Sequence, residues 1–107
     1  MVKKFIKVSL QVEGIHCWPE CPLEEVSFLR DRHRHMFYIT ALKGVNHSDR
    51  DIEIIMLKRS ILKYFGKQPI EFHDSSCEMI AEALLEKFEL QECEVLEDNE
   101  NGARITL

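Results

Sequence analysis

Three histidines in the first third of the chain have residue types and spacing that suit a metal site. His33 and His35 are two residues apart in a run of apolar residues that is typical of a β-strand. Because successive side chains of a strand point to opposite faces, these two imidazoles should project to the same side. His16 ends an earlier strand-like segment. Three neutral imidazoles with one open coordination position suit zinc, so His16, His33 and His35 are candidate zinc ligands.

Two other interpretations of these residues stay open. The histidines could be surface residues that stack or form hydrogen bonds without a metal. Alternatively, Cys17 or Cys21 could join them as ligands, although a C-x3-C pair differs from the spacing of a zinc knuckle and supplies only two ligands.

Strands are expected on both sides of this cluster. Apolar and polar residues alternate from Lys4 to Glu13, as in a half-buried antiparallel strand. Gly14 interrupts the alternation just before His16, which indicates a bulge or a close backbone approach. Residues 33–45 are apolar on both faces, so this second strand should be covered on both sides.

The segment between these strands, residues 17–31, contains two prolines and no sustained period. It predicts a loop with one short helical turn at residues 24–29. We expect Trp18, Phe28 and Leu29 to attach this loop to the body of the protein. A loop of this length in a small domain favours a functional role over a simple connection.

Two helices should follow. A polar turn at residues 46–51 supplies capping residues for the first helix, and Gly66 ends it. After a short connector through residues 69–74, Ser75 or Ser76 caps the second helix, with Glu78 in its first turn. The apolar stripes predicted to face the core are Ile54, Leu57, Ile61 and Phe65 in the first helix, and Cys77, Ile80, Ala81, Leu84 and Phe88 in the second.

The chain ends in a predicted hairpin, with arms at residues 93–96 and 103–107 around a polar turn. The order is strand, strand, helix, helix, strand, strand, which predicts an α+β fold: one domain, residues 1–107, with a four-stranded antiparallel sheet and two helices on one face. Since the helices can cover only one face, burial of the other face in a homo-oligomer would explain the apolar second strand.

Composition excludes several classes of protein. The net charge of −5 disfavours a nucleic-acid-binding protein. No apolar run approaches the ~20 residues of a membrane span, and the first residues lack the apolar region of a signal peptide. We therefore expect a cytoplasmic protein with no membrane or nucleic-acid partner, in which the four cysteines stay reduced.

This order of elements and motifs resembles the tunnelling fold of the 6-pyruvoyl- and 6-carboxytetrahydropterin synthase family. In that family a histidine near the end of the first strand and an H-x-H that opens the second strand hold zinc, which His16, His33 and His35 match. Residues 53–58 and 76–81 are similar to the starts of the family's two helices. The resemblance covers nearly the whole chain, and it implies subunits that assemble into a barrel, as a hexamer or another homo-oligomer.

The resemblance also implies a ligand. The family's V-x-E motif is matched by Val95-Leu96-Glu97, which implies that Glu97 anchors the amidine-like edge of a pterin or purine ring. A carboxylate can accept two parallel N–H bonds from such an edge. Arginine side chains near the pocket could bind a phosphate or carboxylate of the ligand. The residues expected to bind the ligand are Glu97, Ser76, Glu78, Arg32, Arg34 and Trp18. The simpler interpretation is that the charged residues are solvated and that the tryptophan anchors its loop.

Two catalytic features of the family have no clear match. Its cysteine lies a few residues before the H-x-H, where this chain has Ser-Phe-Leu-Arg at residues 27–30. Its Asp-His pair has only a reversed counterpart, His73-Asp74. We therefore assign no catalytic residues and predict a non-catalytic protein that sequesters or senses a purine-, pterin- or nucleotide-like molecule, as a phage protein that soaks up a nucleotide signal would do.

Two alternatives stay open. One is a zinc-dependent lyase or synthase that acts on a dihydroneopterin triphosphate-type substrate through substitute groups such as Cys17, Cys21 or His73. The other is a structural oligomer with a vestigial pocket.

Overall fold

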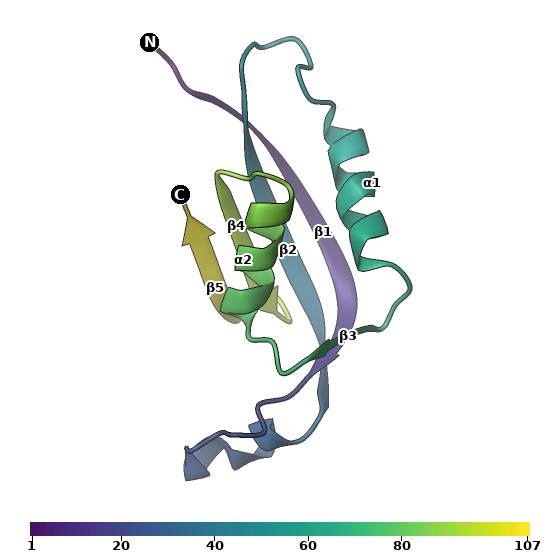
Figure 1. Ribbon diagram of the computed structural model, residues 1–107, viewed down its shortest axis with the longest axis vertical. Helices are drawn as coiled ribbons and strands as arrows, with labels where there is room; N and C mark the ends of the chain where they lie inside the picture. The colour runs from purple at the N-terminus through teal and green to yellow at the C-terminus, as the bar shows by residue number, and fades with distance from the viewer.

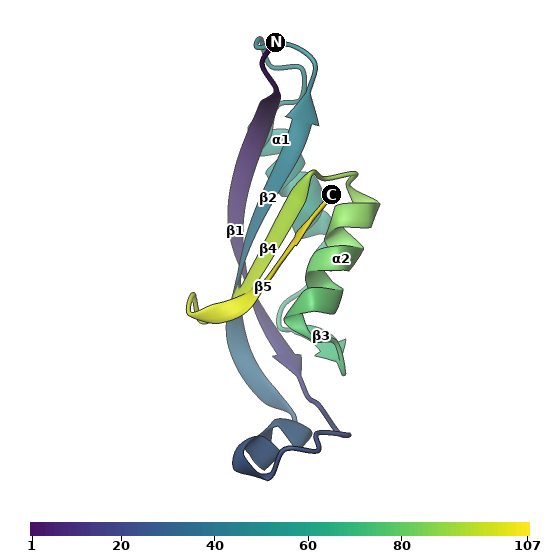
Figure 2. The ribbon, with the colours of Figure 1, turned by 90° about the vertical axis from the view of Figure 1, so that its left-hand side faces the viewer.

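Two helices pack on one face of a five-stranded sheet (Figures 1 and 2). The computed structural model describes residues 1–107 and has the predicted α+β architecture. The sheet order is β3-β1-β2-β4-β5, and all neighbouring strands are antiparallel except β3 and β1. The elements are β1 (Lys4–His16), β2 (His33–Val45), α1 (Ile54–Phe65), β3 (Ile70–His73), α2 (Cys77–Lys87), β4 (Glu92–Glu97) and β5 (Asn101–Thr106).

The two long strands β1 and β2 are the centre of the sheet. They pair along their whole length, with Val12 opposite Phe37 and Leu10 opposite Ile39. Directly opposed residues share a face, and these four side chains are buried beneath the helices. The alternation predicted for the first strand is therefore confirmed, and it extends three residues further, to His16.

Strand β3 is the main departure from the predicted fold. It lies in the segment predicted to be a connector and runs parallel to the end of β1, with Ile70 opposite Gly14 and His73 opposite His16. Four residues are too few to show a period of two, so only the pairing with β1 identifies this segment as a strand. The sheet is consequently mixed and five-stranded, whereas four antiparallel strands were expected.

Helix α1 begins at a carboxylate. The side chain of Glu53 accepts hydrogen bonds from the backbone N–H groups of Ile55 and Met56, both at 3.0 Å. The capping residue is thus Glu53, two residues beyond the polar turn at residues 46–51 that was predicted to supply it. Leu57 and Ile61 are buried as expected. The expected burial of Ile54 is wrong: this first residue of the helix is 49% exposed, because contact with the sheet begins one turn later, at Leu57.

Gly66 ends α1 with a φ of +80°, a conformation that suits glycine. Helix α1 packs against β1, whereas α2 packs against β4 and β5. The Ser76 hydroxyl caps α2 by accepting from the Met79 N–H at 3.1 Å, which confirms the second of the two predicted caps. The predicted stripe of α2 is buried up to Leu84, and Phe88 forms the C-terminal cap.

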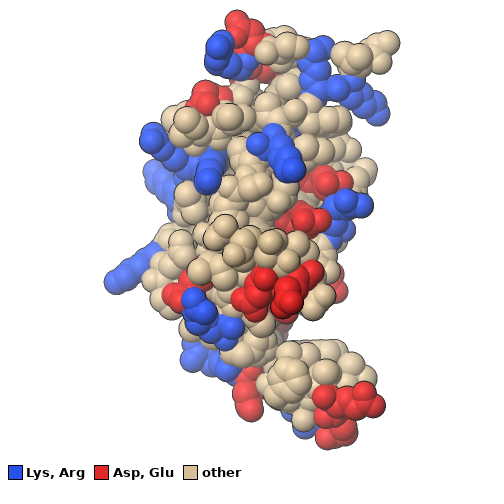
Figure 3. Space-filling model, turned by 180° about the vertical axis from the view of Figure 1, so that it is seen from behind, with Lys and Arg blue, Asp and Glu red and all other residues tan.

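Residues 17–31 form a lobe that projects beyond the end of the sheet (Figures 1 and 3). A 3₁₀ segment, Glu24–Arg30, lies where the short helical turn was predicted. The Trp18 N–H donates to the Leu29 carbonyl at 2.6 Å and closes the neck of the lobe. The expected apolar attachment is wrong for Phe28, which is 67% exposed; the lobe instead packs around Cys21.

The face of the sheet opposite the helices is open in the single chain. Figure 3 views this face, where acidic and basic side chains are scattered among uncharged ones. Met36, Tyr38 and Leu42 lie on it half-buried, so the predicted cover on both sides of β2 is absent within one chain. Burial of this face in an oligomer stays a prediction. None of the helices is long and apolar enough to cross a bilayer.

Gly14 lies where two aromatic rings press on the backbone of β1, which confirms the predicted close approach. A Cβ atom there would lie 2.5 Å from Phe72 Cε2 and 2.8 Å from Phe37 Cε2. Because the Phe37 ring is fully buried, Gly14→Ala should lower the free energy of unfolding by ~1–3 kcal/mol, measured by urea denaturation. The control is Gly44→Ala, since a Cβ there meets nothing closer than 4.0 Å. Equal stability of the two variants would contradict this account.

Candidate metal centre

The three predicted histidines lie together at one end of the sheet. In the ladder between β1 and β2, His16 is opposite His33, and Gly14 is opposite His35. All three imidazoles therefore continue the row of core-facing side chains that ends in Val12 and Phe37. One ring nitrogen of each histidine lies within 4.8 Å of the corresponding nitrogens of the other two. The predicted convergence is confirmed.

Each histidine has its Nδ1 atom bound to an oxygen acceptor outside the cluster. The partners are the Ser75 carbonyl for His16 at 2.8 Å, the Asp31 carbonyl for His33 at 2.8 Å, and a carboxylate oxygen of Asp98 for His35 at 2.7 Å. Since carbonyl and carboxylate oxygens only accept hydrogen bonds, each Nδ1 carries the proton. In the neutral imidazole this leaves the Nε2 lone pair free to bind a metal.

Two of these Nε2 atoms lack a proper partner. Those of His16 and His35 are buried and make no hydrogen bond. Glu97 comes close, with its Oε2 atom 2.9 Å from His16 Nε2 and its Oε1 atom 3.6 Å from His35 Nε2, but the approach lacks the alignment of a hydrogen bond. An unsatisfied buried polar atom costs ~1–3 kcal/mol. A metal ion held by the three Nε2 atoms would remove that cost, so the residues fit zinc.

Glu97 lies on the helix-facing side of the sheet because it pairs with Phe37 across β2 and β4. The contact with His16, helped by the nearby His35, holds the pKa of Glu97 below its ordinary value against the effect of burial. Burial by itself would lower the pKa of His16, but the Glu97 carboxylate and the Ser75 carbonyl outweigh it and raise this pKa above 6.5. Carboxylate and imidazole therefore attract each other.

Asp98 contacts the histidine cluster, although the sequence did not suggest it as a site residue. Besides accepting from His35, its carboxylate accepts from the Met36 N–H at 3.0 Å, so it is fixed at both oxygens. The hydrogen bond from His35, followed by that from Met36, lowers the pKa of Asp98. Carboxylates that orient a metal-binding histidine in this way fix its tautomer and raise its basicity. No residue spacing reveals this role, because it depends on the turn between β4 and β5.

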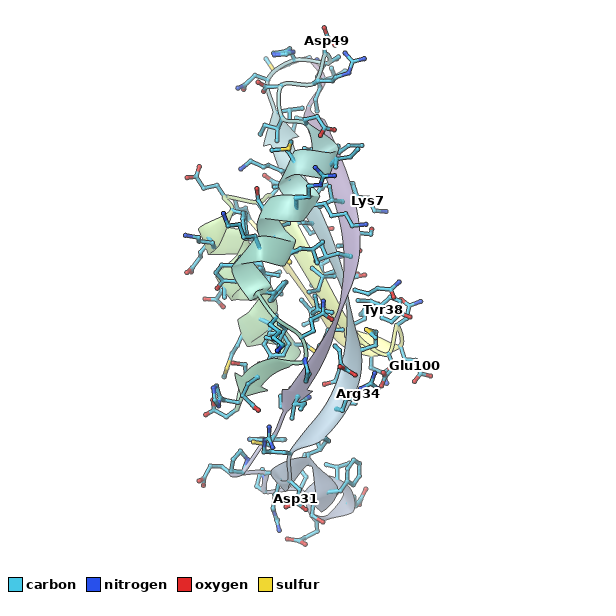
Figure 4. The ribbon with its side chains drawn as sticks, turned by 90° about the vertical axis from the view of Figure 1, so that its right-hand side faces the viewer. Lys7, Asp31, Arg34, Tyr38, Asp49 and Glu100 are labelled. Atoms are coloured by element: carbon cyan, nitrogen blue, oxygen red, sulfur yellow. The ribbon has the colours of Figure 1, made fainter.

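Asp98→Asn should weaken zinc binding by about 10–100-fold, the usual range for an outer partner of a metal ligand. Asparagine tolerates the φ of +53° at this position, so the turn should persist. Competition with a chromophoric chelator would measure the affinity. Glu100→Gln is the matched control, because Glu100 belongs to the same turn but lies away from the helices (Figure 4). Unchanged affinity in Asp98→Asn would contradict the role assigned to Asp98.

A cavity of about 480 Å³ opens beside the histidines. Of the residues expected to bind a ligand, four line it: Trp18, Ser76, Glu78 and Glu97. Asp74, Ser75, Cys77 and Met79 also line it, although none of them was expected to bind the ligand. The complete lining is His16, Cys17, Trp18, Leu29, His33, Asp74, Ser75, Ser76, Cys77, Glu78, Met79, Glu97, Asn101 and Gly102.

The two arginines expected to bind a ligand are outside this lining. Arg32 forms an ion pair with Glu71, which lowers the pKa of that carboxyl, and Arg34 forms an ion pair with Glu13. Figure 4 shows Arg34 on the side of the sheet away from the helices, opposite to the face that holds the histidines. Ligand binding by these arginines stays a prediction, and the lining of the cavity does not support it.

The four cysteines differ in access. Cys17 lines the cavity and is half-buried, whereas Cys21 is buried within the lobe, where its thiol contacts the Leu23 carbonyl at 3.7 Å. Burial, and to a lesser degree nearby carboxylates, raise the pKa of Cys77 and of Cys93 to about 12.

Iodoacetamide at neutral pH should therefore modify one thiol per folded chain, that of Cys17. The thiolate is the reactive form, and Cys77 and Cys93 are both buried and protonated at this pH. Intact-mass spectrometry would count the adducts, and four should appear in guanidinium chloride. Rapid modification of Cys93 in the folded protein would be incompatible with its burial.

No family model matches the chain, and no curated protein matches it either.

Proposed function

We propose that this protein binds zinc through His16, His33 and His35, and that it holds a purine- or pterin-like ring in the adjoining cavity without transforming it. Sequestering or sensing such a molecule would be its role. We also propose a distant relation to the tetrahydropterin synthases, with assembly of the chain into a barrel-shaped homo-oligomer.

One observation carries the zinc proposal. Three Nδ1 atoms are bound outward to oxygen acceptors, and the facing nitrogens of the three rings converge, two of them buried beside Glu97 without an aligned hydrogen bond. Zinc in such a site keeps an open coordination position, where it can hold a ligand or polarise a carbonyl group.

The chemistry of the cavity beside the histidines supports the proposal that a ring binds there. The Glu97 carboxylate lies on the cavity wall, with its two oxygens toward His16 and His35. With zinc on the histidines, these oxygens would be free to accept from adjacent N–H groups of a guanine- or pterin-like edge. Trp18 and Met79 provide apolar surface for the faces of a planar ring. The volume falls within the ~300–1,000 Å³ typical of small-molecule sites.

Native mass spectrometry of the protein purified without chelators tests the proposal. We expect each chain to carry one zinc ion, a mass that corresponds to a ring of this class after isolation from cells, and a multiple of the chain mass for the oligomer. Metal analysis of the same sample identifies the ion. Protein that never takes up zinc, even after refolding with the metal, would refute the metal site.

A zinc-dependent lyase is the second candidate, and one observation favours it. Cys17 lines the same cavity as His16 and His33, so a thiol is available there as an acid or base. If this interpretation holds, zinc-loaded protein should consume a dihydroneopterin triphosphate-type substrate, and Cys17→Ser should abolish the activity. We expect no turnover, since the cavity lacks the positive groups that a triphosphate needs.

A further inference from the structure

We propose that the cavity beside the histidines selects a nitrogen-rich ring, or its nucleoside, that carries no phosphate group. This inference rests on the proposed function, because it specifies the ligand of the same site. It excludes nucleotides and phosphorylated pterins as the natural ligand.

The charge of the cavity is the first argument. Its ionisable side chains, apart from histidine and cysteine, are the carboxylates of Asp74, Glu78 and Glu97, and no lysine or arginine of the same chain lines it. Zinc would bring two positive charges against these three negative ones, so the loaded cavity keeps a net negative charge. A phosphate monoester adds about −1.5 to −2 at neutral pH and would meet repulsion.

The basic residues nearest in sequence to the site are already paired. Arg30 contacts the Glu24 carboxylate at 2.9 Å and donates to the Cys21 carbonyl at 2.9 Å. Arg32 is paired with Glu71, a residue of β3 outside the cavity lining. Moving either guanidinium to a phosphate would break an existing ion pair.

Besides the zinc site, the start of α2 is a feature of the cavity that could attract an anion, since the first backbone N–H groups of a helix have no partner within the helix. However, the Ser76 hydroxyl already accepts from the Met79 N–H, and Glu78 places a carboxylate in the first turn. These groups balance the positive end of the helix dipole. A phosphate would have to displace them.

An uncharged ring avoids these costs. It can donate N–H bonds to Glu97 while its faces contact Trp18 and Met79, and it brings no negative charge near Asp74 or Glu78. A cationic ring would gain further from the same carboxylates. The cavity thus suits the base or nucleoside form of the ligand.

Isothermal titration calorimetry of the zinc-loaded full chain would compare guanosine with guanosine 5′-monophosphate. The two probes share the ring and sugar and differ only in the phosphate. We expect the monophosphate to bind at least about tenfold more weakly, because like charges brought together cost binding energy. The difference in affinity between the two probes should shrink as the sodium chloride concentration is raised, since the carboxylates of Asp74 and Glu78 are exposed and thus screened by salt.

The double variant Asp74→Asn/Glu78→Gln tests the cause. It removes two negative charges with little change in shape and leaves Glu97 and the histidines intact, so the preference for guanosine over guanosine 5′-monophosphate should fall. Asp49→Asn/Glu100→Gln is the matched control, because it also removes two charges but neither residue lines the cavity. The control should keep the wild-type preference.

The outcomes separate the two proposals. Weaker binding of the monophosphate that the double variant relieves supports the exclusion of phosphate. Equal or tighter binding of the monophosphate by the wild-type protein overturns the exclusion and leaves ring binding in place. If neither guanosine, its monophosphate nor free pterin binds, the proposed ring-binding function fails, and this inference fails with it.

Discussion

The double variant His33→Ala/His35→Ala should purify without zinc, whereas the wild-type chain should hold one ion. The substitution removes two of three nitrogen donors, and His16 cannot retain zinc alone because structural and catalytic zinc sites use at least three protein ligands. The fold should survive, since both side chains are only half-buried and lie at the beginning of β2. Metal analysis after dialysis against a weak chelator gives the stoichiometry.

A matched control separates specific from incidental binding. His47 lies in the turn before α1, outside the cluster, so His47→Ala should keep its zinc. Circular dichroism of each variant would show that the fold is intact. Full zinc occupancy in His33→Ala/His35→Ala would mean that these histidines do not form the site, however well their nitrogens converge.

Glu97→Gln should lower the affinity for guanosine or pterin by about 100-fold, since hydrogen bonds to a charged group contribute ~1.5–3 kcal/mol each. Glutamine has nearly the same shape, but it replaces one acceptor oxygen with an NH₂ group that faces the ring's own N–H donors. Zinc should remain bound, because the three histidine donors are unchanged. Calorimetry of the zinc-loaded variant measures the loss.

Glu94→Gln is the matched control for this experiment. Glu94 also belongs to β4 but pairs with Thr40 and thus lies on the helix-free face. Its replacement removes the same charge from the same strand at a position outside the cavity beside the histidines. If Glu97→Gln binds the ring as tightly as Glu94→Gln does, Glu97 is not the anchor.

The histidine cluster could be predicted because its geometry follows from strand periodicity alone. Alternation places His33 and His35 on one face, and the end of the preceding strand brings His16 opposite His33. Glu97 was predicted as a ligand-binding residue only from the resemblance to the tetrahydropterin synthases. Its position at the cavity depends on the pairing of β4 with β2. A single sequence does not reveal which strands become neighbours.

Other parts of the site had no local signal. The Ser75 carbonyl that orients His16 is a backbone group, and any residue could supply it. Strand β3 forms only because β1 offers an unpaired edge. Phe28 was expected to be buried from its residue type, but the lobe in which it lies extends past the sheet and has little to pack against.

The closed neck of the lobe has a consequence for how this protein could vary. The lobe joins β1 and β2, whose pairing ends at His16 and His33. Just beyond this pair, the hydrogen bond from the Trp18 N–H to the Leu29 carbonyl holds the two ends of the lobe together. The length of the lobe is thus uncoupled from the spacing of the histidine nitrogens, and lengthening a closed loop costs little free energy. Insertions or shorter turns within residues 19–28, none of which lines the cavity, should therefore change the lobe while the three histidines stay in register.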